Sequence, residues 1–66
     1  MNVKKAIKIA MAQRDTNQKE LSVSSGVSET TLSHTISGRS SPNAKTIAKI
    51  AEGLNMSYSE LVKLGE

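Results

Sequence analysis

The stretch "GVSETTLSHTISG", Gly26 to Gly38, decides how this chain folds, because it combines helical spacing with residues that disfavour helices. Three Ser, three Thr and one His lie between the two glycines. β-Branching or competition for backbone hydrogen bonds lowers the helix propensity of these residue types. Yet Leu32 and Ile36 are four residues apart, as on one face of a helix, and Ser28 can cap it. We therefore predict a polar helix between two chain-turning glycines.

The sequence before this stretch predicts two helices. Near the start, apolar residues recur at the i, i+3, i+4, i+7, i+8 spacing of one helix face: Val3, Ala6, Ile7, Ala10 and Met11. Asn17 and Glu20 then form the pattern of a capping box. They predict a second helix over residues 18–25, which ends before Gly26.

The sequence after the stretch predicts two more helices. Asn43 or Ser41 can cap a helix along residues 44–55. Its expected apolar stripe is Ala44, Ile47, Ala48, Ala51 and Leu54. Ser57 and Glu60 form another capping box, which begins a last helix within residues 57–65. With no convincing strand, the predicted fold class is all-α, built from five short helices.

Length and composition predict one domain over residues 1–66 and exclude several classes of site. The chain has no Cys and a single His, so disulfides and cysteine-based metal sites are excluded, and we expect no metal or cofactor. The apolar residues of the N-terminal segment are interrupted by Lys8 and Gln13, so neither a signal peptide nor a membrane span is predicted. A reducing, cytoplasmic location is consistent with the absence of Cys.

Positive charge is concentrated in the first three quarters of the chain. Residues 1–49 hold eight Lys or Arg and three acids, for a net charge of +5, whereas residues 50–66 have a net charge of −2. This asymmetry favours a polyanionic partner, with nucleic acid first and an anionic membrane second. The membrane reading is weakened by the absence of Trp and Phe and by the need for the first apolar stripe in the core.

The central spacing matches the physical requirements of a helix-turn-helix over about residues 17–37. Ser22 is small enough to let the next helix approach, and Gly26 permits a left-handed turn between the two helices. Val27 and Leu32 can anchor the second helix to the core. In such units the second helix enters the DNA major groove with its N-terminal residues against base edges, while the first crosses the backbone.

From Ile7 onward, the chain resembles the phage-repressor and Cro-type helix-turn-helix proteins, the lambda-repressor-like or XRE-type family. The resemblance covers "NQKELSVSSGVSETTLSHTISG" and "SPNAKTIAKIAEGLNMSYSELV", including Pro42 and the "IAEGLN" segment of the fourth helix. It implies a compact five-helix domain that binds double-stranded operator DNA, as a homodimer at least when on DNA. It further implies a phage or prophage Cro-like repressor, found with the nucleoid in the cytoplasm of a bacterial or phage-host cell.

The resemblance also assigns roles to individual residues. The implied groove-facing residues are Glu29, Thr30, Ser33 and His34. The implied phosphate contacts are Gln18, Lys19, Ser28, Ser37, Arg39, Ser40, Asn43 and Lys45. By chemistry, Glu29 can accept a hydrogen bond from a cytosine amine, Thr30 can pack its methyl group on thymine, and His34 can donate to guanine.

Two positions depart from the family pattern. Many members place an Arg in the first helix and a Glu in the third, which form a partly buried ion pair, whereas this chain has Met11 and Ile36. Because an apolar contact can replace a buried ion pair with little loss, we predict that these two side chains meet in the core. Ser22 stands where Ala is common, which costs little provided that its hydroxyl bonds back to its own helix.

Other functions receive less support from the residues. Ser33, His34 and Asp15 do not suggest a catalytic triad, since neighbours on a helix point about 100° apart, and we expect neither an enzyme nor a small-molecule ligand. The alternative from another class is a protein-interaction module on the same fold, such as an antitoxin-like or anti-repressor partner. Tyr58, Leu61 and Leu64 either close the core or form a dimer patch.

Overall fold

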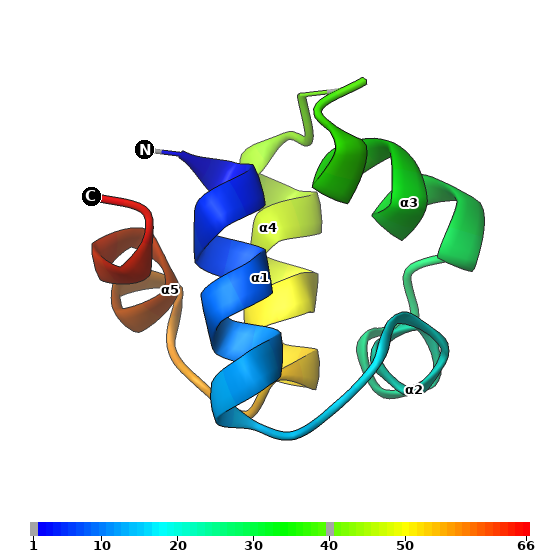
Figure 1. Ribbon diagram of the computed structural model, residues 1–66, viewed down its shortest axis with the longest axis horizontal. Coiled ribbons are helices and arrows are strands. Elements are labelled where there is room, and N and C mark those ends of the chain that lie inside the picture. Colours follow the sequence, from blue (N-terminus) through cyan, green and yellow to red (C-terminus); the bar gives the residue numbers. More distant parts are fainter. Residues whose placement is uncertain (1, 40) are drawn as a thin grey trace.

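The computed structural model describes residues 2–39 and 41–66. They form five α-helices, and no β-strand occurs within these two ranges (Figure 1). The helices are α1 (Val3–Gln13), α2 (Gln18–Ser25), α3 (Glu29–Ser37), α4 (Ala44–Gly53) and α5 (Tyr58–Leu64). The predicted all-α, five-helix fold is therefore confirmed.

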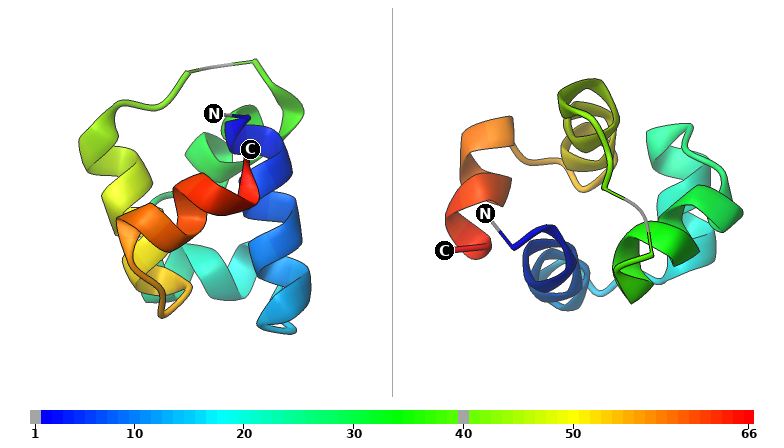
Figure 2. Two further views of the ribbon diagram at one scale, coloured as in Figure 1. Left: turned by 90° about the vertical axis from the view of Figure 1, so that its left-hand side faces the viewer. Right: turned by 90° about the horizontal axis from the view of Figure 1, so that it is seen from above.

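The five helices surround one core. α1 packs between α3 and α5, α2 packs against α3 and α4, and α4 also touches α5. Figure 2 shows, in its view from above, how the helices are arranged around a common centre. Asn2 and Gly65 meet beside α1, where the backbone N–H of Asn2 donates to the Gly65 carbonyl at 2.9 Å. Short connections and shared packing thus hold α2 and α3 against the other three helices.

Each helix contributes at least one fully buried aliphatic side chain to the core. These residues are Ile7 of α1, Leu21 of α2, Leu32 of α3, Ile50 of α4 and Leu61 of α5. Full burial of such a side chain contributes about 1.5–3 kcal/mol. Since several helices in this chain have weak intrinsic propensity, their packing on the core supplies much of their stability.

The apolar face of α4 differs from the predicted one. Ile47, Ala51 and Leu54 are buried as expected, but Ala44 and Ala48 are exposed. Ile50, left out of the predicted stripe, is fully buried. The helix is rotated so that its large Ile side chain enters the core, because burying Ile removes more apolar surface from water than burying Ala.

The C-terminal helix closes the core. Leu61 is fully buried and Leu64 is half-buried against the core, whereas Tyr58 is 43% exposed. These residues could either close the core or form a dimer patch, and both leucines close the core. Ile9 of α1 is half-buried.

Short polar side chains cap the helices as the sequence predicts. Asn17, Ser28, Asn43 and Ser57 each accept a hydrogen bond from the backbone N–H three residues later. Asn43, and not Ser41, caps α4. The reciprocal capping box is complete at Ser57 and Glu60. At α2 the structure gives the bond from the Glu20 N–H to Asn17 at 2.8 Å, without the return bond of a full box.

The two residues that replace the family ion pair both pack against the core. Met11 and Ile36 are half-buried and belong to the apolar shell around the buried cluster. Their helices, α1 and α3, pack directly on one another. Neither side chain lies mainly in water, so the arrangement agrees with an apolar replacement, and direct contact between the two side chains stays a prediction.

Candidate nucleic-acid interface

The turn between α2 and α3 is held by backbone conformation and by serine hydroxyls. Gly26 ends α2 with φ at +75°, in the left-handed region that favours glycine. The Ser22 hydroxyl donates to the Val27 carbonyl at 2.7 Å. The Ser22 hydroxyl thus does not bond back to its own helix: it donates forward across the turn, and this bond satisfies its hydrogen. Val27 itself is buried.

α3 is attached to the core along one face only. Leu32 and Thr35 are buried, and the Thr35 hydroxyl donates to the Thr31 carbonyl at 2.9 Å, which satisfies its hydrogen. Ser28 caps the first turn and also bonds to the Thr31 hydroxyl at 2.8 Å. Gly38 ends the helix with φ at +80°. The two glycines and the Leu32 anchor thus fix where this helix begins, ends and points.

The opposite face of α3 is free for a partner. All four side chains predicted to face the groove are exposed: Glu29, Thr30, Ser33 and His34. Together they offer a carboxylate, two hydroxyls and an imidazole, which can accept from or donate to base edges. The structure therefore brings the four predicted base contacts onto one outward-facing helix.

Gln18 has a structural contact that the sequence does not reveal. Its side-chain Nε2 donates to the Glu29 carbonyl at 3.3 Å, which joins the first residue of α2 to the first residue of α3. The bond crosses the turn between two helices, so no local pattern signals it. Since the amide has two N–H groups, one donor is left for another partner. Lys19, the next residue, is exposed.

The predicted phosphate contacts at the far end of α3 come from its last turn and from the start of α4. Ser37, Arg39, Asn43 and Lys45 are exposed, whereas Ser40 lies outside the described residues. The Ser37 hydroxyl donates to the His34 carbonyl at 3.2 Å, and the Asn43 side chain accepts from the Thr46 N–H at 2.8 Å. The two ends of α3 are therefore both flanked by predicted phosphate contacts, of which Ser28 and Ser37 donate their hydroxyl hydrogens to Thr31 and His34 in this structure.

Two further kinds of feature can be judged over the described ranges, namely metal-binding clusters and membrane-spanning helices. They contain no group of three or more His, Cys, Asp or Glu side chains placed to hold a metal ion. No helix among the described residues has the length and apolar character needed to cross a membrane.

A helix-turn-helix with an exposed, polar second helix defines a class of DNA-binding proteins. The comparison with protein families agrees with this geometry, since a family model described as helix-turn-helix matches residues 7–61. The chain belongs to the XRE-type, lambda-repressor-like helix-turn-helix family, and it is a DNA-binding transcription regulator of that type. The comparison with curated proteins found no match.

Proposed function

We propose that the protein is a phage or prophage Cro-like repressor, which binds a palindromic operator as a homodimer through the major groove. The observation that supports this most directly is the exposed polar face of α3, formed by Glu29, Thr30, Ser33 and His34. A helix built of poor helix formers, yet held by Leu32 and two left-handed glycines, presents polar groups at a defined position. Occupation of an operator by such a protein blocks access of RNA polymerase.

In this proposal, base contacts and phosphate contacts have separate tasks. The outward side chains of α3 read base edges, with Glu29 accepting from a cytosine amine and His34 donating to guanine. Phosphates are bound at the two ends of α3, by Gln18, Lys19 and Ser28 at one end. At the other end the proposed contacts are Ser37, Arg39, Ser40, Asn43 and Lys45. These contacts set the position of the helix on the duplex but carry no sequence information.

The proposed homodimer matches the geometry of the proposed target. One copy of α3 spans only a few base pairs, and two copies related by a two-fold axis reach half-sites about one helical turn, roughly 34 Å, apart. A palindromic operator matches that symmetry. Two half-sites also provide the affinity that a single short helix lacks.

The first prediction concerns the salt dependence of DNA binding. The wild-type protein is expected to bind duplex DNA with an affinity that falls steeply as salt rises, because each neutralised phosphate releases counterions. With three or more phosphate contacts per protomer, the slope of log K against log salt should be about −5 or steeper for a dimer. Fluorescence anisotropy on a labelled duplex, measured from low to physiological salt, gives this slope.

Selection from random duplexes at the same salt tests specificity and symmetry together. A palindromic consensus is the expected result, since it requires both base reading and two-fold assembly. Enrichment of a single, asymmetric half-site would contradict the homodimer. A protein that neither binds duplex nor enriches any sequence would instead fit the protein-interaction alternative.

The second prediction isolates base reading by Glu29. Glu29→Gln replaces an acceptor that suits cytosine with an amide that pairs with adenine, so the preferred base should change at one position per half-site. The matched control is Glu52→Gln on α4, which removes the same charge from an exposed side chain distant in sequence from α3. The selection is repeated with both variants. Unchanged preference in Glu29→Gln would show that Glu29 serves only the dipole of α3.

A further inference from the structure

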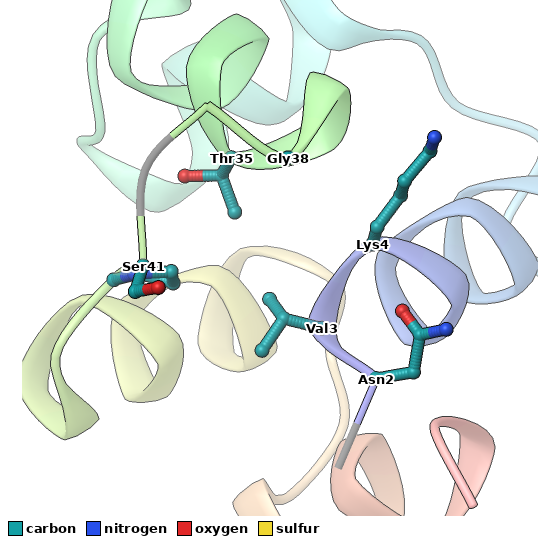
Figure 3. A pocket seen from close by; sticks show the side chains of 7 residues that line it. Asn2, Val3, Lys4, Thr35, Gly38 and Ser41 are labelled. Carbon is teal, nitrogen blue, oxygen red and sulfur yellow. The ribbon is translucent and has the colours of Figure 1, made fainter.

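A groove of about 560 Å³ lies between the start of α1 and the segment that joins α3 to α4 (Figure 3). Asn2, Val3 and Lys4 line one side, and Thr35, Gly38, Ser41 and Pro42 line the other. The far side therefore belongs to the same end of α3 at which Ser37 and Arg39 are exposed. The sequence and its family resemblance predict no DNA contact in α1.

Lys4 is the charged residue of this groove. Val3 points into the groove, whereas the Lys4 side chain extends from the rim of α1 out of the groove, away from the other lining residues (Figure 3). Lys5, the next residue, has a different position, because a helix turns about 100° per residue. Its Nζ donates to the Glu66 carbonyl at 3.1 Å, on the side of the C-terminus. The two lysines are equal in charge but face different surroundings.

Among the residues that line the groove, Lys4 alone carries a charge. The Thr35 hydroxyl gives its hydrogen to the Thr31 carbonyl, and the Asn2 side-chain oxygen accepts from the Lys5 N–H at 3.0 Å. The Asn2 side-chain N–H groups remain as donors, but they lie on the other side of the start of α1 from the Lys4 ammonium (Figure 3). The lining contains no Asp or Glu that would neutralise the lysine.

We propose that Lys4 binds a phosphate of the operator backbone, next to the phosphates bound by the end of α3 and the start of α4. The inference rests on the proposed function, since it places the DNA backbone along that end of α3. Lys4 then adds a contact from α1, across the groove from Gly38. As a phosphate contact, it contributes to affinity and salt dependence but not to the choice of sequence.

The test compares Lys4→Gln with Lys5→Gln in the full chain, using the salt titration on the selected operator. Lys4→Gln should reduce the steepness of the salt slope by about 0.9 per protomer, which is about 1.8 for a dimer. Lys5→Gln removes the same charge from the same helix and should leave the slope within error. Lys4→Arg, which keeps the charge, should retain the wild-type slope. Thermal melts confirm that the variants fold.

The outcomes separate this inference from the function on which it rests. Equal slopes for Lys4→Gln and Lys5→Gln, with normal wild-type binding, would overturn the Lys4 contact alone. A changed consensus sequence for Lys4→Gln would also overturn it, because a phosphate contact does not read bases. A wild-type protein that fails to bind duplex would overturn both the contact and the proposed function.

Discussion

Replacement of Leu32 by Ala is expected to lower the free energy of unfolding by about 3 kcal/mol. Leu32 is fully buried and is the large aliphatic side chain that anchors α3 to the core. Its truncation loses the transfer energy of the removed groups and leaves a cavity, a combination that costs about 2–5 kcal/mol in cores. For a domain of this size, a loss of 3 kcal/mol lowers Tm by about 12–24 °C.

The neighbouring Ser33→Ala variant is the matched control for this prediction. Ser33 is exposed, so its loss should change stability by less than about 0.5 kcal/mol. Urea unfolding followed by circular dichroism measures both variants. Ser33→Ala should remain fully folded, but it should bind the operator more weakly or with an altered sequence preference. A Leu32→Ala protein as stable as the wild type would refute the role of Leu32 as the anchor.

Replacement of Gly53 by Ala is expected to destabilise the protein by about 2 kcal/mol, although Ala is a much better helix former. A Cβ at Gly53 would lie 2.6 Å from the Cβ of Ser25 and 2.8 Å from its Cα and backbone N. Backbone atoms cannot rotate aside, so α2 and α4 must separate. The close approach is also held by the Ser24 hydroxyl, which donates to the Gly53 carbonyl at 3.1 Å.

Glu52→Ala provides the control for Gly53→Ala. Glu52 precedes Gly53 on α4 but is exposed, so the substitution should be nearly neutral. The double variant Gly53→Ala with Ser25→Gly removes the Cβ clash and leaves the backbone contacts, so it should recover only part of the lost stability. Denaturant midpoints at constant m-value measure the series. A stabilised Gly53→Ala protein would mean that helix propensity outweighs the contact between α2 and α4.

The local features of the fold could be predicted because their causes are local. Asn17, Ser28 and Ser57 cap helices where the sequence places them, since each cap depends on a side chain and an N–H three residues away. Gly26 and Gly38 adopt the left-handed conformation at the predicted helix ends. The pattern that predicts a helix-turn-helix is therefore largely a pattern of neighbours in the chain.

Contacts between helices could not be predicted in the same way. The rotation of α4, which buries Ile50 and exposes Ala48, depends on the shape of the space left by the other helices. The bond from Gln18 to the Glu29 carbonyl and the close approach at Gly53 likewise join groups from different helices. The periodicity of apolar residues along a single helix does not encode distances between atoms of different helices.

The five helices, the caps at Asn17, Ser28 and Ser57, and the polar character of the segment from Gly26 to Gly38 could all be predicted from the sequence. These properties follow from propensity, hydrogen bonding and periodicity within a few residues. Packing between helices fixes which of their faces are free, and it puts Lys4 of α1 across a groove from the end of α3. The physical reason is that the burial of Leu32 on one side of α3 leaves the other side of this helix exposed to a partner.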